Sequence, residues 1–134
     1  MRTKLSLQQK NYMLAKAAVA MAEDNENAYE AKFLEERGHS EPHCWQIDDN
    51  NVFESVIHEL DDDAEYHRLF METRAAEERL HEAEERLIDW SLDWVPKSIT
   101  EKVVPHRNEF SVREKLIDLA FRLDASTIPE QARK

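Results

Sequence analysis

Two consecutive heptads in the middle of the chain constrain its fold more than any other feature. The segments AEERLHE (76–82) and AEERLID (83–89) share their first five residues. Extending their frame outward gives mostly apolar or small residues at alternating spacings of three and four, the pattern of a coiled-coil seam about four heptads long. The seam residues are Tyr66, Leu69, Thr73, Ala76, Leu80, Ala83, Leu87, Trp90 and Trp94. We predict one long helix here, which begins after the acidic residues 61–63 and stops before Pro96.

A second long helix is predicted before it, within residues 1–37. Ser6 is a favoured N-cap, and Gly38 stands where many helices end in a left-handed residue. The stretch 23–27 contains poor helix formers, so a division into two helices there remains an alternative. Alanine dominates the apolar positions, which lets another helix approach closely. These positions are Leu7, Leu14, Ala17, Ala18, Met21, Ala28, Ala31 and Phe33.

Two partners fit the heptad seam. The seam can pack against the first helix of the same chain as an antiparallel hairpin, because that helix has a matching length and an apolar face to bury. It can also pack on its own copy in a second chain, which would give a homodimer. The sequence leaves both arrangements open.

The rest of the chain is predicted to form a linker and shorter helices. In the linker, residues 38–50, Gly38 and Pro42 interrupt helical periodicity, and Trp45 is expected to anchor the loop to the core. The segment 51–95 opens with a short helix before the long one. Its apolar stripe is Val52, Phe53, Val56, Ile57 and Leu60.

Two capping boxes are predicted to open the C-terminal helices, which lie within residues 96–125. They are Ser98 with Glu101 and Ser111 with Glu114. The second helix runs to about Leu123 with an apolar side, and residues 126–134 form a tail.

Composition agrees with a purely helical chain. One glycine among 134 residues excludes glycine-rich phosphate loops and tight hairpins. Charged residues make up 35%, against about 25% in an average domain, which favours amphipathic helices. The length suits one domain over residues 1–134. We therefore predict an all-α fold, a helical bundle with a long antiparallel helical hairpin or coiled coil and a short C-terminal helical segment.

The net charge of −11 is concentrated in the middle of the chain. Residues 23–95 hold 23 acidic and 6 basic residues, whereas residues 1–22 carry a net charge of +4 and residues 96–134 a net charge of +2. Binding to nucleic-acid phosphates depends on Lys and Arg, so the acidic block disfavours direct nucleic-acid binding. It attracts basic proteins instead, including proteins that bind nucleic acid. The plainer explanation is that the charge only solvates long helices.

Few residues are placed for chemistry. The motif at 78–81 has the Glu-x-x-His spacing of di-iron bundles, and so does 36–39, across the helix-ending glycine. His39, His43 and Cys44 are close enough in sequence for zinc but lack the second cysteine usual at closed sites. Cys44 beside His43 also resembles a nucleophile with its base, without a supporting motif. We predict no catalytic residue, no metal and no cofactor.

The expected compartment is the cytoplasm. A lone cysteine forms no intrachain disulfide, which favours a reducing environment. Polar residues at 8–12 interrupt any apolar stretch near the start, so we expect neither a signal peptide nor a membrane span.

These observations favour a non-enzymatic interaction protein that binds a basic protein surface. In its specific form, the carboxylates imitate a phosphate track and inhibit a DNA- or RNA-binding protein, as small phage or plasmid accessory proteins do. The residues predicted to bind the partner are Glu59, Asp61, Asp62, Asp63, Glu65, Glu77, Glu78, Glu82, Glu84, Glu85 and Asp89. The alternatives are a coiled-coil assembly module and a helical-bundle metalloprotein.

Overall fold

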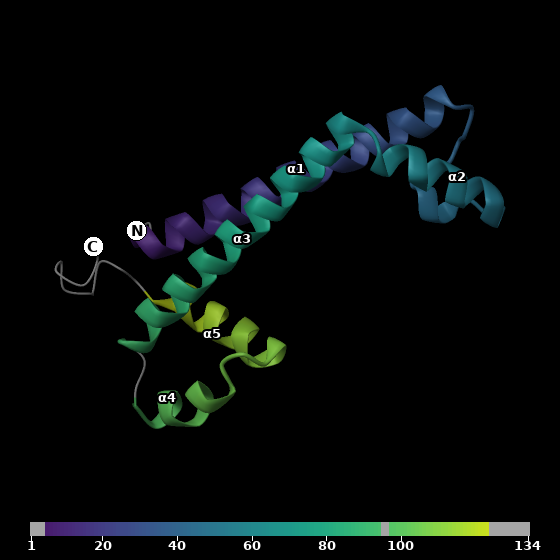
Figure 1. Cartoon of the computed structure of the whole chain (residues 1–134). Helices are drawn as coiled ribbons and strands as arrows, with labels where there is room; N and C mark the ends of the chain where they lie inside the picture. Colours follow the sequence, from purple (N-terminus) through teal and green to yellow (C-terminus); the bar gives the residue numbers. More distant parts are fainter. Residues whose placement is uncertain (1–4, 95–96, 124–134) are drawn as a thin grey trace. The chain divides into compact units, whose positions relative to one another are not determined.

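All regular elements in the described part of the chain are helical. The computed structural model describes residues 5–94 and 97–123 (Figure 1). Its α-helices are α1 (Leu7–Glu36), α2 (Asn50–Asp61), α3 (Ala64–Leu92), α4 (Lys97–Val103) and α5 (Phe110–Arg122), with short 3₁₀ turns η1 (Cys44–Gln46) and η2 (Val104–His106). The predicted all-α fold is confirmed. Pro96 and the tail predicted at 126–134 lie outside the described residues.

The chain divides into two compact units that separate its charge. The terminal unit comprises Met1–Lys16 and Arg79–Lys134, and the acidic unit is Ala17–Glu78, so α1 and α3 each contribute a segment to both. The acidic unit holds 18 acidic and 4 basic residues, a net charge of −14, whereas the terminal unit carries a net charge of +3. The excess negative charge of the sequence therefore belongs to one unit.

The start of α1 is set by a reciprocal capping box. The backbone N–H of Gln9 donates to Ser6 Oγ at 3.1 Å, and the backbone N–H of Ser6 donates to Gln9 Oε1 at 2.7 Å. Ser6 is therefore the N-cap, as expected. The helix continues unbroken through residues 23–27, so the alternative of two separate helices was wrong.

The end of α1 is set by its glycine. Gly38 has a φ of +84°, in the left-handed region where other residues are strained. Its N–H donates to the Glu35 carbonyl, and the N–H of His39 donates to the Leu34 carbonyl, both at 3.0 Å. This pair of bonds is a Schellman motif, which satisfies carbonyls that the ending helix leaves open.

The core of the acidic unit forms where α1, η1 and α2 meet. Its buried members are Phe33, Leu34, Cys44, Val56 and Leu60, and the residues packed on them are Tyr29, Ile47, Val52, Phe53 and Tyr66. Most of the stripe predicted for the short helix thus faces this core. Asp49 caps α2, because its carboxylate accepts from the N–H groups of Asn51 and Val52.

All nine predicted seam residues of α3 are buried or half-buried. Within each unit, a segment of α1 packs against the segment of α3. The predicted apolar face of α1 was wrong in part, since only Phe33 is buried and Ala31 half-buried. The exposed members are Leu7, Leu14, Ala17, Ala18, Met21 and Ala28. Inward positions with the same three-four spacing are instead Gln8, Tyr12, Ala15, Val19, Ala22, Glu26, Tyr29 and Phe33.

Specific contacts explain this rotation of α1 better than alanine content does. In the terminal unit the buried Gln9 amide donates to the carbonyls of Ala120, at 2.8 Å, and Leu123, at 3.1 Å. In the acidic unit the aromatic side chain of Phe33 lies in the core. A buried amide must keep its hydrogen-bond partners. An aromatic side chain buries more apolar area than alanine does. Gln9 and Phe33 therefore decide which face of α1 turns inward.

The terminal unit has a core of its own. Its buried members are Leu87, Trp90 and Ala120, and Tyr12, Trp94, Ile117, Phe121 and Leu123 pack on them. The two tryptophans near the end of α3 therefore pack in a core, and the ring of Tyr12 lies 5.6 Å from that of Phe121. Of the side predicted to be apolar on α5, Leu116 and Ala120 are fully buried.

Both predicted capping boxes in the C-terminal region were wrong. Helix α4 begins at Lys97 and α5 at Phe110, so Ser98 and Ser111 lie inside their helices. Glu109 is the N-cap of α5, and its side chain makes no capping bond. Tertiary contacts override the local signal, because Arg113 in the first turns of α5 bonds carboxylates of α3.

Candidate functional site

Three of the predicted partner-binding residues, Glu84, Glu85 and Asp89, pair with two arginines inside the terminal unit. The Arg113 guanidinium donates from Nε to Glu84 Oε1 at 2.7 Å and from Nη1 to Glu85 Oε1 at 2.5 Å. Arg107 lies 2.9 Å from Glu85 and 2.9 Å from Asp89. The Arg113 side chain is only 13% exposed. This network holds α5 and the residue after η2 to α3. It leaves three carboxylates with two arginines, and the Asp89 side chain stays 65% exposed.

The same network keeps Glu85 ionised. Hydrogen bonds from Arg113 lower the pKa of Glu85 below its ordinary value, and the charges of Arg113 and Arg107 act in the same direction. Partial burial opposes them without reversing the shift. A carboxylate fixed in this way serves the fold, because breaking one partner of such a network leaves the other charge poorly solvated.

Three more predicted residues have partners inside the acidic unit. Glu59 and Glu65 each pair with an arginine on the exposed surface, an arrangement that adds little stability. Asp63 caps α3 by accepting from the N–H of Tyr66 at 2.9 Å, and it accepts from the Tyr29 hydroxyl at 2.7 Å. The bond from Tyr29, followed by the backbone bond, lowers the pKa of Asp63.

The remaining five predicted residues are exposed, and the structure gives them no ion pair within the described part of the chain. They are Asp61, Asp62, Glu77, Glu78 and Glu82, of which only Glu82 lies in the terminal unit. Sequence reasoning missed further exposed acids of the acidic unit, because it concentrated on the heptad region. Besides the capping Asp49 and the Arg68-paired Glu72, they are Glu23, Asp24, Glu35, Glu36, Asp48 and Glu54. The acidic unit thus presents carboxylates from α1, α2, α3 and the loop before α2.

The loop between α1 and α2 differs from its prediction. Trp45 is 72% exposed, so the expectation that it anchors the loop was wrong, and Cys44, 2% exposed, occupies the core instead. Glu30 on α1 holds the loop, with Oε1 2.6 Å from His43 Nδ1 and Oε2 accepting from the Cys44 N–H at 3.5 Å. The rings of His43 and Trp45 are stacked, with centroids 5.8 Å apart and planes 12° apart.

The features predicted around Cys44 and the histidines can be compared with their placement. Burial, and then the charge of Glu30, raise the pKa of Cys44 to about 11, so the thiol stays protonated at neutral pH and is a poor nucleophile. No group of three or more His, Cys, Asp or Glu side chains within residues 5–94 and 97–123 is placed to hold a metal ion. The candidate ligands at 36–39, 43–44 and 78–81 therefore gain no further ligand there.

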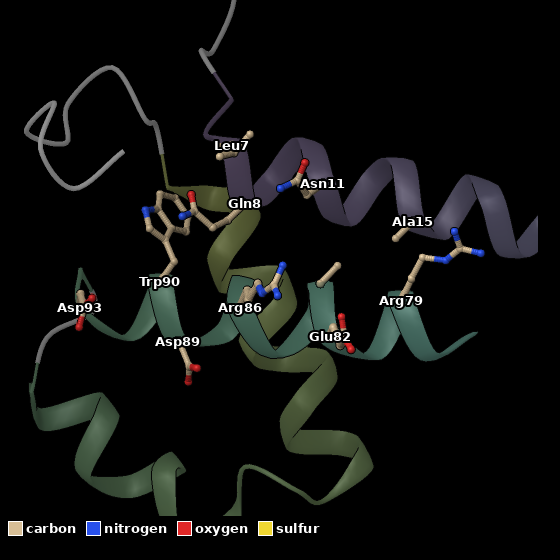
Figure 2. A pocket seen from close by; sticks show the side chains of 11 residues that line it. Leu7, Gln8, Asn11, Ala15, Arg79, Glu82, Arg86, Asp89, Trp90 and Asp93 are labelled. Atoms are coloured by element: carbon tan, nitrogen blue, oxygen red, sulfur yellow. The ribbon is translucent and has the colours of Figure 1, made fainter. Parts of the chain in front are cut away.

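A cleft of about 640 Å³ lies in the terminal unit between the first part of α1 and the last part of α3 (Figure 2). Its lining residues are Leu7, Gln8, Asn11, Ala15, Arg79, Glu82, Ala83, Arg86, Asp89, Trp90 and Asp93. Figure 2 shows charged members of both signs, of which Arg79, Glu82, Arg86 and Asp89 come from α3 and Asp93 directly follows it. The described lining contains no cysteine, serine, lysine or histidine, and its titratable acids are Glu82, Asp89 and Asp93.

Within the described residues, no helix has both the length and the apolar character needed to cross a membrane. No protein-family model, curated protein or solved structure matches the chain.

Proposed function

We propose that this chain is a non-enzymatic interaction protein whose acidic unit binds the basic surface of a partner protein. The observation that carries the proposal is the separation of charge, with −14 on the acidic unit and +3 on the terminal unit. Exposed carboxylates on three helices of one unit favour encounter with basic surfaces and disfavour contact with phosphate.

The proposed partner surface is one that normally binds nucleic acid. Rows of carboxylates along helices resemble the repeated negative charge of a phosphate backbone, so a basic cleft accommodates either of them. Occupation of the cleft by the acidic unit excludes DNA or RNA. The chain would then act as an inhibitor of a nucleic-acid-binding protein, of the type made as phage or plasmid accessory proteins.

A capture experiment with two matched variants tests this proposal. The full chain is immobilised and incubated with a bacterial lysate, and bound proteins are eluted with duplex DNA. The acidic-unit variant changes Asp61, Asp62, Glu77 and Glu78 to Lys. The control changes four exposed acids of the terminal unit to Lys, namely Asp93, Glu101, Glu114 and Asp118.

The wild type and the control should retain basic proteins that duplex DNA displaces, and the acidic-unit variant should lose them. Both variants have the same net charge, so a difference between them reports where the charge lies. Equal capture by the two variants, or capture that DNA does not displace, would contradict the proposal.

A second candidate, a coiled-coil assembly module, is favoured by one observation on α1. Leu7, Leu14 and Met21 repeat at seven-residue intervals and are more than half exposed, which is a pattern for pairing with another helix. The test is the mass in solution of the wild type and of Leu14→Glu. A dimer that the variant converts to a folded monomer would support self-association, and a monomeric wild type would exclude it.

A further inference from the structure

Trp45 is the most exposed aromatic side chain among the described residues of the acidic unit. It is 72% exposed, whereas the next, Phe70, is 39% exposed. Leaving an indole in water forgoes a large favourable burial, and tryptophan is enriched among residues that dominate binding to other proteins. Its exposure makes it available for contact with another molecule. The same holds for Phe110 in the terminal unit, and the surrounding charge distinguishes the two.

The indole lies beside an imidazole that α1 holds in place. Since a carboxylate only accepts hydrogen bonds, the 2.6 Å contact with Glu30 places a hydrogen on His43 Nδ1 and fixes the imidazole ring. The indole of Trp45 stacks on that ring. With the two ring centroids 5.8 Å apart and Trp45 72% exposed, most of the indole stays open to a ligand.

Aromatic faces of this unit already receive arginine. The guanidinium of Arg37 lies 3.4 Å from the ring centroid of Phe33, and that of Arg74 lies 5.7 Å from the centroid of Phe70. Tryptophan attracts cations more strongly than phenylalanine does. Among the described residues, no arginine or lysine is placed over the Trp45 ring.

The negative charge around Trp45 favours some ligands of its exposed face over others. The surrounding unit carries −14, and the exposed Asp48 follows Trp45 by three residues. Anionic ligands are repelled, and a second copy would bring an identical acidic unit against the first. A basic side chain gains from the ring and from the carboxylates together.

We propose that the open face of Trp45 is the anchor at which an arginine or lysine of the basic partner stacks. The inference rests on the proposed function, because it assumes that the acidic unit is the binding surface. It adds a short-range contact to the long-range attraction between the acidic unit and its partner.

Binding of a fluorophore-labelled nona-arginine peptide to the full chain, followed by anisotropy, tests the anchor. Trp45→Leu removes the ring, and Trp45→Phe keeps an aromatic face. The matched control is Phe110→Leu, because Phe110 is 78% exposed and lies in the terminal unit. Circular dichroism checks that each variant is folded.

Trp45→Leu should lower the affinity for the peptide by about 3- to 30-fold, and Trp45→Phe should lower it by less. Phe110→Leu should leave the affinity unchanged. Binding of Trp45→Leu within twofold of wild type, while the acidic-unit Lys variant binds weakly, would overturn the anchor and leave the proposed function standing. Unchanged binding by both would overturn both. Loss of a wild-type dimer in Trp45→Leu, with the peptide affinity unchanged, would make Trp45 a contact between copies and overturn the anchor.

Discussion

The two units use their acidic residues in opposite ways, although the same two helices run through both. In the terminal unit, Glu84 and Glu85 pair with Arg113 and hold α5 to α3. In the acidic unit, apolar and aromatic residues form the core, and most carboxylates face solvent. Glu77 and Glu78 of the first heptad thus face solvent in the acidic unit, whereas Glu84 and Glu85 of the second bond Arg113 in the terminal unit. Whether basic residues lie nearby in the fold decides which role an acid takes.

The largest expected effect comes from the apolar core of the acidic unit. Leu60 is 1% exposed in that core, so Leu60→Ala should reduce the free energy of unfolding by about 3 kcal/mol. The loss should be nearly independent of salt, because no charge is removed. Urea unfolding in 0.1 M and 1 M NaCl measures it, with the exposed Leu14→Ala as the control. A loss below about 1 kcal/mol would mean that this core contributes little.

The ion-pair network of the terminal unit should give a somewhat smaller effect. Arg113→Met leaves Glu84 and Glu85 without that partner, and we expect a loss of about 2 kcal/mol. Adding Glu84→Gln to this variant should restore part of the loss, because one uncompensated charge is removed. A double-mutant cycle from urea unfolding measures the coupling. Additive effects of the two substitutions would show that the pair is not coupled.

High pH should destabilise the acidic unit more than the terminal unit. The bond to Asp63 raises the pKa of Tyr29 to about 12, and burial raises those of Tyr66 to about 12 and Cys44 to about 11. For these three groups the pKa in the folded state lies above the pKa in the unfolded state. Their contribution to stability is therefore complete below the unfolded-state pKa values. It is lost as pH rises through the folded-state pKa values, between about pH 9 and 12.

Hydrogen exchange resolved by peptide, at pH values up to 10, should therefore show protection falling first in α2 and the adjoining end of α1. Burial also raises the pKa of Tyr12 in the terminal unit, so α5 should lose some protection as well, to a smaller extent. If α5 loses protection at a lower pH than α2 does, the terminal unit is the more sensitive to high pH, which would contradict this prediction.

Low pH should give the smallest effect, and Arg113 should control it in the terminal unit. The pKa of Glu85 is lowered, so its contribution is complete above the unfolded value, about 4.3, and is lost as pH falls through the folded value. Thermal unfolding at pH 5 and pH 3 measures the loss. Arg113→Met should show a smaller difference between the two pH values than the wild type, since the interaction that lowers the pKa is gone. If Arg113→Met and the wild type show the same difference between pH 5 and pH 3, the acid sensitivity arises from groups other than Glu85.

Periodicity predicted the helices well, because burial along a helix repeats at three and four residues wherever the partner lies. The two ends of α1 were also predictable, since Ser6 and Gly38 act through local backbone bonds. Which face of α1 turns inward was not, because it depends on the buried Gln9 amide and carbonyls more than a hundred residues away. The starts of α4 and α5 were missed when local capping signals were trusted over tertiary contacts.

The candidate site was predictable in kind and less so in its members. Net charge by segment identified an acidic surface, but it counted carboxylates that pair with Arg107 and Arg113, because ion pairs between distant segments leave no local pattern. Trp45 was placed in the core because large aromatic residues are usually buried. The neighbouring Cys44 fills that space, and nothing in the loop sequence says which of two adjacent residues points inward.

Hydrogen exchange of the full chain with and without saturating nona-arginine tests most directly whether the acidic unit is the binding surface. We expect added protection in the loop at 38–49 and in α2, with α4 and α5 unchanged. Protection confined to α4 and α5, or the same small change along the whole chain, would contradict the division of roles between the two units.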